Sequence, residues 1–387
     1  MKRIVIVALA TAGFAAVPVL AQSPGVTKSE IVIGSIQDLS GPIAGYGKAL
    51  RNGLQFRVDA INEAGGINGR KIKLVVEDSG YDPKKAVLAA QKLVQKDRVF
   101  AVAGTVGTPI NLAAMPIQFE KNVLNFLPIA SAREMFEPIS PLKWSFAATY
   151  FDQVRTGAKW MIKAKGSKRV CVLYQDDDFG QEILRGTEAG LKEIGMQVLE
   201  RTSFKRGATD FSSQVQRLRN ADCDLVVLGT IIRETIGAVG EARKIGWGVE
   251  FLGSSAAYDT LIPKLGGKLM DGFYTMNTLN FPYMDDASKN VRDWGQAYKA
   301  KFNEEPTIFS VYGDLVITIF ADVASKAGPA LTTETFIAAL EKYTRPRDMF
   351  GADVIAFSKT QHLGTNRARL SQVQNGKWVQ VTDYLGD

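Results

Sequence analysis

Residues 38–71 read DLSGPIAGYGKALRNGLQFRVDAINEAGGINGRK, and this stretch decides the fold class. It joins the end of a strand, a glycine-rich turn, a long helix and a second glycine-rich turn. Leu50, Leu54, Val58 and Ile61 form one apolar stripe, which indicates that the helix packs against a core. Because a helix N-terminus presents unpaired N–H groups, a loop of this kind is a usual place for a small ligand in α/β proteins.

The start of the chain has the pattern of a secretion signal. Lys2 and Arg3 precede a short apolar run, which ends in a small-residue cleavage pattern before Gln22. We expect residues 1–21 to be a signal peptide and the mature protein to lie outside the cytoplasm. An uncleaved membrane anchor is the alternative, and the shortness of the apolar run argues against it. No later segment is expected to have the apolar length that a bilayer requires, so the mature protein should be soluble.

Length and charge restrict the class of protein. The chain has 387 residues, and 366 remain when residues 1–21 are removed. This length is too great for one typical core and suits two α/β lobes. Removal of Lys2 and Arg3 with the signal lowers the formal net charge from +7 to +5, and the basic residues form no block. We therefore expect no nucleic-acid partner.

Short Val- and Ile-rich runs alternate with helical patterns, which is typical of a parallel sheet with crossover helices. One series lies in the first half of the chain and a second follows it, so we predict an α/β fold with two doubly wound lobes. The expected strands are 31–37, 72–77, 99–103, 169–174, 197–204, 225–228 and 272–276, with a final β segment through residue 378. The expected helices are 46–64, 83–96, 151–163, 181–194, 211–219, 234–244, 287–302, 310–327 and 335–343.

The two cysteines lie at or near the starts of buried strands. Cys171 is in the run RVCVLY, and Cys223 precedes LVVLG. Secretion permits a disulfide between them. Because neighbouring parallel strands rarely meet disulfide geometry, the sequence favours two free buried thiols, with the disulfide as the alternative.

Loops at the C-terminal ends of the expected strands are the candidate ligand site. They contain hydroxyl groups, glycines and aromatic rings, and Tyr46 is expected to expose its ring. Thr108 is expected to cap a helix that starts at Pro109, which leaves N–H groups for a ligand carboxylate. The loops are residues 38–46, 104–109, 129–131, 176–180, 230–232 and 254–258.

Other chemistries fit the sequence poorly. The segment Gly45–Lys48 resembles the end of a phosphate-binding loop, but Pro42 and Ala49 replace the required glycine and Ser/Thr. His362 is the single histidine, lies in a polar segment and is expected at the surface. The acidic run Asp176–Asp178 is expected to cap a helix, with a cation site as the alternative. We predict no enzyme activity, no metal and no cofactor.

Several motifs together resemble the leucine/isoleucine/valine-binding family, the periplasmic type I solute-binding proteins of ABC importers. They are SGP and the Tyr46-Gly47 turn, INEAGGINGRK at residues 61–71, the helix opened by Asp-Pro, DDDFGQEILRG at 176–186 and the GxW before residue 379. The resemblance covers essentially the whole mature chain. It implies two Rossmann-like lobes joined by three crossover segments, with lobe 1 from 22–149 and about 278–356 and lobe 2 from 150–277 and about 357–387.

The resemblance also implies binding positions. Tyr46 matches the family's first-turn aromatic, and Thr108 matches the hydroxyl that holds the ligand carboxylate. The predicted ligand-binding residues are Tyr46, Thr105, Gly107, Thr108, Ile129, Ser131, Phe179, Ile231 and Ser255. Ser255 departs from the family, since amino-acid binders place an acidic residue there to pair with the ligand ammonium.

That departure bears on the ligand, because an unpaired ammonium in a closed cleft costs several kcal/mol. An amino acid would need Asp178 or Asp259 to move into the site. We therefore favour a small organic carboxylate, plausibly aromatic, with a hydrophobic amino acid as the second choice. Arg133 is expected at the surface, with added charge at the site as the alternative.

The predicted function is capture of a solute for an inner-membrane ABC permease, by a monomeric protein whose lobes close on the ligand. A sensory ligand-binding protein that docks on a receptor has the same fold and remains the alternative. An extracytoplasmic enzyme is a third class, and no motif in the chain requires it.

Overall fold

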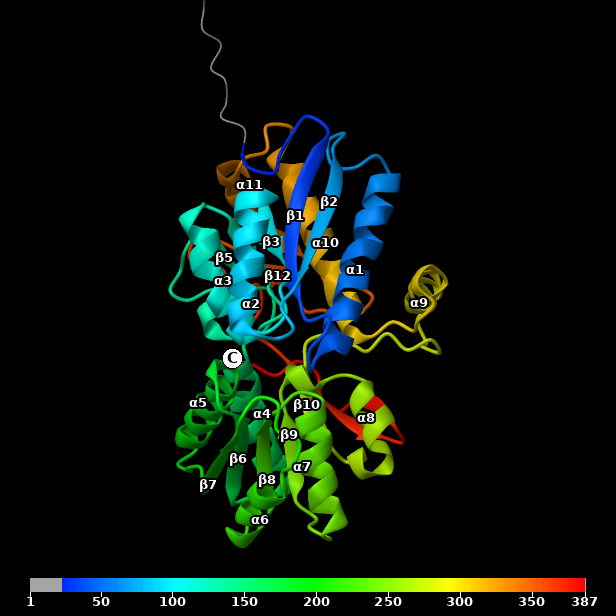
Figure 1. Cartoon of the computed structure of the whole chain (residues 1–387). Helices are drawn as coiled ribbons and strands as arrows, with labels where there is room; N and C mark the ends of the chain where they lie inside the picture. The colour runs from blue at the N-terminus through cyan, green and yellow to red at the C-terminus, as the bar shows by residue number, and fades with distance from the viewer. Residues whose placement is uncertain (1–22, 387) are drawn as a thin grey trace, which may run out of the picture.

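The computed structural model describes residues 23–386, which fold into two α/β lobes, one above the other in Figure 1. The expected signal peptide lies outside the described residues. Each lobe is built on one sheet with helices packed on it, and the chain passes from one lobe to the other three times. The predicted fold class is therefore confirmed, while the lobe boundaries by residue number remain predictions.

The first lobe contains a parallel five-stranded sheet in the order β2-β1-β3-β4-β5. Its strands are β1 (Glu30–Gln37), β2 (Lys71–Asp78), β3 (Ala101–Ala103), β4 (Leu124–Phe126) and β5 (Lys143–Trp144). The helices of this lobe are α1 (Ala44–Glu63), α2 (Pro83–Gln91), α3 (Thr108–Glu120), α10 (Ile308–Ala327) and α11 (Thr333–Leu340), with α9 (Lys289–Phe302) at its side. Helices α1, α10 and α11 pack together, and α2 packs against α3.

The second lobe contains a seven-stranded sheet in the order β14-β13-β10-β9-β8-β6-β7. Its strands are β6 (Val170–Gln175), β7 (Glu200–Phe204), β8 (Leu225–Gly229), β9 (Glu250–Gly253), β10 (Tyr274–Asn277), β13 (Arg369–Gln374) and β14 (Lys377–Gln380). Strands β13 and β14 are antiparallel to their neighbours, and the rest of the sheet is parallel. Its helices are α4 (Tyr150–Lys165), α5 (Asp178–Glu193), α6 (Ser212–Asn220), α7 (Arg233–Lys244) and α8 (Leu261–Gly266).

The three crossovers follow β5, β10 and the short strand β12 (Ile355–Ala356), which pairs with β11 (Thr344–Arg345). The first and third run side by side, because the Ser145 amide donates to the His362 carbonyl at 2.9 Å and the Gly364 amide donates to the Ser145 carbonyl at 2.8 Å. The second follows Asn277 and leads to α10, which returns to the first lobe. The lobes therefore share a multi-stranded hinge.

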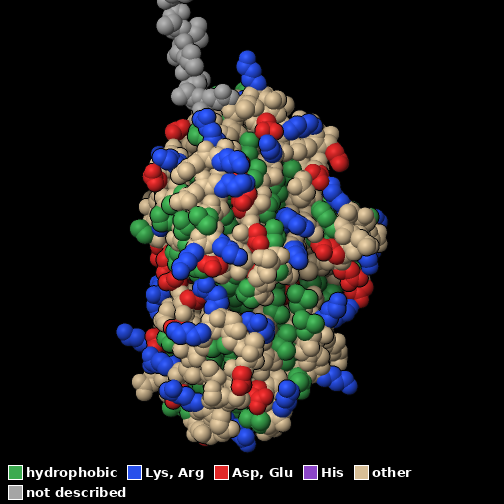
Figure 2. Space-filling view, in the orientation of Figure 1, with side chains coloured by type: hydrophobic (Ala, Val, Ile, Leu, Met, Phe, Trp, Pro, Cys, Tyr) green, Lys and Arg blue, Asp and Glu red, His purple; other side chains and the backbone are tan. Residues whose placement is uncertain are grey.

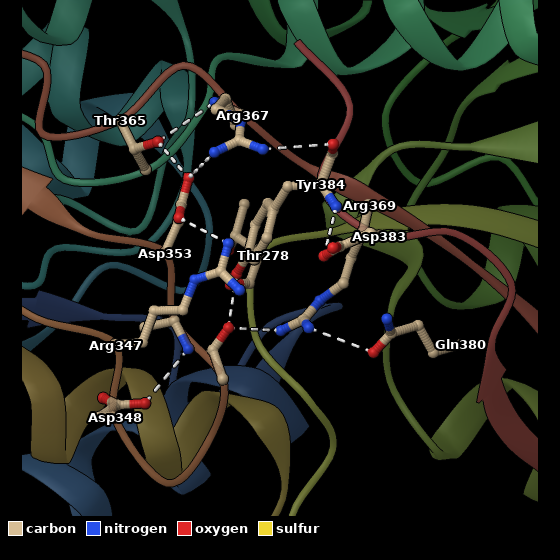
Figure 3. Close-up of polar contacts among 12 residues, drawn as sticks. Thr278, Arg347, Asp348, Asp353, Thr365, Arg367, Arg369, Gln380, Asp383 and Tyr384 are labelled. Atoms are coloured by element: carbon tan, nitrogen blue, oxygen red, sulfur yellow. Dashed lines mark hydrogen bonds and ion pairs between the residues drawn. The ribbon is translucent and has the colours of Figure 1, made fainter.

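The C-terminal segment is tied to this hinge by the polar contacts in Figure 3. The Tyr384 hydroxyl lies 2.8 Å from the Thr278 carbonyl oxygen and 2.6 Å from that of Gly351. Arg369, at the start of β13, donates to the same Gly351 carbonyl at 2.6 Å. Its guanidinium lies 4.6 Å from the centre of the Tyr384 ring. One buried tyrosine thus contacts the second crossover and a loop of the first lobe.

Most expected elements are confirmed, and the differences have local causes. The helix expected at 83–96 ends at Gln91 and continues as a π-helical turn over Lys92–Lys96. Helix α10 is long and apolar enough to span a membrane. The expectation that no segment after the signal peptide has the apolar length that a bilayer requires is therefore wrong. In the structure 78% of the apolar window of α10 is buried in the first lobe. Helix α10 lies very close to α1 at Gly313. A Cβ added to this glycine would lie only 2.5 Å from the Leu50 carbonyl oxygen, so the helices could not approach this closely with a larger residue.

His362 is buried, so its expected surface position is wrong. Only 3% of the residue is exposed. The imidazole stacks on Trp144 with ring centres 3.6 Å apart, and Nδ1 lies 3.0 Å from the Lys143 carbonyl oxygen. Burial lowers the pKa of His362. Because the sequence neighbours of His362 are polar, the sequence did not indicate that it packs on Trp144 at the crossover.

The expectation of free thiols is also wrong, because Cys171 and Cys223 form a disulfide across 52 residues of chain. Cys171 lies in β6, but Cys223 lies in the turn before β8, next to Asp222 with φ 57°. The turn frees Cys223 from the geometry of parallel strands, and the Cα atoms lie 6.0 Å apart.

We predict that this disulfide stabilises the second lobe. A closed loop of 52 residues should contribute roughly 2–4 kcal/mol to the free energy of unfolding. Urea unfolding of the double variant Cys171→Ala/Cys223→Ala, and of the native chain under reducing conditions, measures this contribution. Unchanged unfolding midpoints in both would contradict the prediction, as would two titratable thiols in unreduced, denatured protein.

Candidate functional site

A cavity of about 50 Å³, measured as space that the centre of a water molecule can reach, lies between the two lobes. One water needs roughly 10–15 Å³ on this measure, so the cavity suits several waters or one compact ligand. Its lining residues are Ile43, Tyr46, Tyr81, Val106, Gly107, Thr108, Pro128, Ile129, Ser131, Ser145, Phe146, Ala147, Tyr150, Phe179, Ile231, Ser255, Ala256, Phe309 and Tyr312.

Thr108 provides the most distinctive polar group in this wall. Helix α3 begins at Thr108 and is capped by Gly107 with φ 96°, so the prediction that Thr108 caps a helix from Pro109 is wrong. The threonine is 1% exposed, and its hydroxyl has no hydrogen-bond partner within residues 23–386. The first N–H groups of a helix also lack partners within that helix. A free hydroxyl and free amides therefore lie together at the cavity.

The neighbouring loop is fixed against this helix start. The Gly107 amide donates to the Ile129 carbonyl at 3.0 Å, which holds the two ligand loops of the first lobe side by side. Two residues later, the Ser131 carbonyl accepts from the Tyr150 amide at 2.6 Å. The loop that carries Ser131 is thus bonded directly to the first residue of α4.

Tyr46 spans the cleft, so the expectation of an exposed ring is wrong. It is 2% exposed, and its ring stacks on Phe309 with centres 3.8 Å apart. Its hydroxyl donates to the Ala256 carbonyl in the second lobe at 3.1 Å. Burial raises the pKa of Tyr46 well above its usual value, with smaller effects from Asp259 and Glu234. The phenol is therefore a neutral hydrogen-bond donor, and the structure is closed.

The second lobe supplies a mostly apolar wall. The Phe179 ring contacts Tyr150 edge to face with centres 5.0 Å apart. Ile231 is 6% exposed. The Ser255 amide donates to the Gln153 side chain at 2.8 Å, which fixes the loop at this position. These residues present rings and an aliphatic side chain to the cavity, with Ser255 as a polar member.

Within residues 23–386, no Asp, Glu, Lys, Arg or His lines the cavity. Five helices, α1, α3, α4, α5 and α10, place residues of their first turns in its wall. Because a helix N-terminus carries a partial positive charge, this arrangement favours an anion without a formal cation. Burial raises the pKa of Tyr81 and Tyr150, and raises that of Tyr312 to about 12, so these phenols are also neutral.

Eight of the nine predicted binding residues line this cavity, and Thr105 does not. Thr105 lies behind the wall, where its hydroxyl accepts from the Ile36 amide at 3.3 Å. The sequence reasoning missed Tyr81, although it follows the end of β2 at the same sheet edge. It also missed Phe309 and Tyr312, because α10 reaches the cleft from the other crossover.

The acidic residues considered for an ammonium lie elsewhere. Asp178 is exposed on α5, and Asp259 is buried beside the cavity without lining it. Asp176 and Asp177 pair with Lys205 and Arg206 at 2.5 and 2.8 Å. Asp177 also caps α5, as expected for this run. The described residues contain no cluster of three or more His, Cys, Asp or Glu that could hold a metal.

Asp259 should make stability depend on pH. Its Oδ1 accepts from the Leu261 amide at 2.8 Å, while Oδ2 has no partner in the described chain. Burial raises the pKa of Asp259 to about 7 from 3.8. Between pH 3.8 and about pH 7, Asp259 keeps its proton in the folded protein and has lost it in the unfolded chain. The free energy of unfolding should therefore fall as the pH rises through this range. The full effect above pH 7 is on the order of 4 kcal/mol.

Thermal or urea unfolding of wild type and Asp259→Asn at several pH values from about 4 to 8 checks this prediction. The variant should be relatively more stable at the alkaline end, and the difference should vanish near pH 4. A constant difference across the range would contradict it. Asp285→Asn is the control, since Asp285 is exposed and Lys377 lowers its pKa.

Comparison with known proteins agrees with this architecture. The periplasmic binding protein family matches residues 30–377. The Leu/Ile/Val-binding protein of Escherichia coli (strain K12) is 28% identical over 296 residues, which cover 76% of this chain and 78% of that protein. The leucine-, isoleucine-, valine-, threonine-, and alanine-binding protein of Pseudomonas aeruginosa is 27% identical over 325 residues, or 84% and 83%.

The fatty acid ABC transporter substrate-binding protein from Thermomonospora curvata has the same fold, with a TM-score of 0.85, 24% identity and 95% coverage of both chains. The family match spans most of the chain. The chain therefore belongs to the periplasmic binding protein family, and proteins named Leu/Ile/Val-binding proteins are similar to it over most of its length.

Proposed function

We propose that this protein is the extracytoplasmic solute-binding component of an ABC importer of the branched-chain and hydrophobic amino-acid type. It captures a small carboxylate-bearing ligand, preferably an aromatic or other organic acid, in the cavity between its lobes. Family membership and the secretion pattern at residues 1–21 support the general role. The chemistry of the cavity wall supports the ligand class.

The observation that carries the ligand class is the cavity itself, which ends at the N-terminus of α3 and is lined by no charged side chain of residues 23–386. A ligand carboxylate at this end accepts from the Thr108 hydroxyl and the first-turn amides. Ser131 lines the same cavity. The aromatic rings of Tyr46 and Phe179 then flank the apolar part of the ligand.

An α-amino acid fits this wall less well. Ser255 supplies a hydroxyl where amino-acid binders of the family have a carboxylate. An ammonium left unpaired in the closed cleft costs several kcal/mol. A micromolar complex has only about 8 kcal/mol of binding free energy in total. A hydrophobic amino acid is therefore the second candidate, and its binding would require Asp259 to turn toward the cavity.

Ligand capture proceeds by hinge closure. A ligand that contacts both lobes stabilises the closed state, because its contacts with the second lobe exist only when the lobes meet. The bond from Tyr46 to Ala256 belongs to this closed set. The closed monomer then docks on an inner-membrane ABC permease. On the face seen in Figure 2, positive and negative side chains are interspersed over both lobes.

A thermal-shift panel tests the ligand class. A ligand that binds only the folded protein raises its stability by RT ln(1 + [L]/Kd), which is about 2.7 kcal/mol at a hundredfold excess over Kd. We expect aromatic or aliphatic monocarboxylates to raise the melting temperature and branched-chain amino acids to leave it unchanged. Stabilisation by leucine or valine without any stabilisation by the acids would contradict this assignment.

Thr108→Val tests the carboxylate pole, because it removes the hydroxyl and keeps the shape of the side chain. Affinity for the best acid of the panel should fall about 10- to 100-fold, the usual loss for a hydrogen bond to a charged group. Stability should not fall, because the hydroxyl has no hydrogen-bond partner in the part of the chain that the structure describes. Calorimetric titration and urea unfolding measure the two effects.

Thr105→Val is the matched control. It removes a hydroxyl that accepts from the Ile36 amide behind the wall. This variant should lower the stability of the protein and leave the ligand affinity nearly unchanged. Equal affinities for wild type and Thr108→Val would refute the placement of the carboxylate.

A further inference from the structure

Arg133 of the first lobe inserts between two helices of the second lobe. It lies in the turn Arg133–Met135, two residues after Ser131. Its guanidinium lies 4.1 Å from the centre of the Phe151 ring on α4. Its Nε and Nη2 atoms each lie 3.3 Å from Oε1 of Glu182 on α5. Arg133 thus contacts the opposite lobe without lining the ligand cavity.

Glu182 is built to receive this arginine. Its side chain is fully buried, whereas the Arg133 side chain is 33% exposed. The second carboxylate oxygen, Oε2, accepts from the Arg133 backbone amide at 3.3 Å. Arg185 of the same helix donates to Oε1 at 2.7 Å, so the carboxylate keeps one cation when the lobes separate. The Arg133 contacts depend on closure, as does a longer ion pair of 3.5 Å between Arg185 and Glu134 of the first lobe.

A second arginine crosses the cleft in the opposite direction. Arg206 of the second lobe pairs with Asp177 of its own lobe at 2.8 Å. Its guanidinium lies 5.0 Å from the centre of the Tyr81 ring, and Nη1 donates to the Tyr81 carbonyl of the first lobe at 3.4 Å. Each lobe therefore places one arginine on an aromatic ring of the other.

We propose that Arg133 and Glu182 form a clasp that stabilises the closed state independently of ligand and positions the Ser131 loop against the second lobe. This inference rests on the hinge closure of the proposed function. The clasp sets the fraction of closed molecules. Because apparent affinity scales with the binding-competent fraction, it scales the affinity for every ligand by one factor. Ligand selectivity stays with the cavity wall.

Small-angle X-ray scattering of the protein without ligand tests the clasp. Arg133→Ala should lower the ratio of closed to open molecules about tenfold or more, since it separates a buried carboxylate from its cross-lobe partner. The radius of gyration should therefore increase. Glu182→Gln should give the same change, and the double variant should give no further change. Circular dichroism confirms that each variant is folded.

Arg201→Ala is the matched control, because Arg201 pairs with Glu188 at 2.8 Å within the second lobe. It should leave the scattering unchanged. Identical scattering of wild type and Arg133→Ala would overturn the clasp, as would an equal change in Arg201→Ala.

Calorimetric titration with benzoate and with phenylacetate separates the clasp from the ligand assignment. The clasp predicts that Arg133→Ala weakens both acids by the same factor, which is the factor by which the closed fraction falls and is at most the fall in the closed-to-open ratio. A loss for one acid alone would overturn the proposal and make Arg133 a ligand contact. If neither acid binds wild type, the preference for an aromatic acid fails, and the scattering result still decides the clasp.

Discussion

The central constraint in this protein is a cavity enclosed by two lobes in which no charged side chain of the described residues takes part. Any charge on a ligand must therefore be balanced by backbone amides, hydroxyl groups and helix ends. The free Thr108 hydroxyl at the start of α3 supplies such a pole, and the phenols around it stay neutral. Within residues 23–386 the opposite wall supplies no carboxylate, so the cavity favours a negative over a positive charge on the ligand.

Some cross-lobe contacts lie in the cavity wall, and others lie beside it. Tyr46 and Ser255 belong to the cavity wall, whereas the Arg133 and Glu182 pair lies outside it. Ser131 links the two sets, because its loop faces the cavity and continues directly into the turn that carries Arg133. The Arg133 and Glu182 contact outside the cavity sets the fraction of closed molecules, and the contacts inside the cavity select the ligand.

Sequence reasoning placed the wall well where the fold rule is local. Loops after parallel strands gather at one sheet edge, and this rule placed Thr108 and Ser131 at the predicted ligand site from the sequence alone. Phe309 could not be found in this way, because α10 returns to the cleft from the second lobe and its first turn follows no strand of the first sheet. Tyr81 obeyed the same rule as the residues that were found and was overlooked.

The remaining errors arose from tertiary packing. The sequence could not show that Cys223 lies in a turn, free of parallel-strand geometry, or that His362 stacks on Trp144 despite polar neighbours. It also could not pair Arg133 with Glu182, because 49 residues separate them and each lies in a polar segment. Such pairings depend on how the lobes meet, which local periodicity does not encode.

The most direct test of a cavity that accepts a carboxylate and rejects an ammonium uses matched ligands that differ only in that group. Calorimetric titration would compare leucine with 4-methylpentanoate, and phenylalanine with 3-phenylpropanoate. The account predicts that at least one deaminated acid binds, and that its amino acid binds at least about a hundredfold more weakly, a difference of about 2.8 kcal/mol. Tighter binding of the amino acid in both pairs would contradict it.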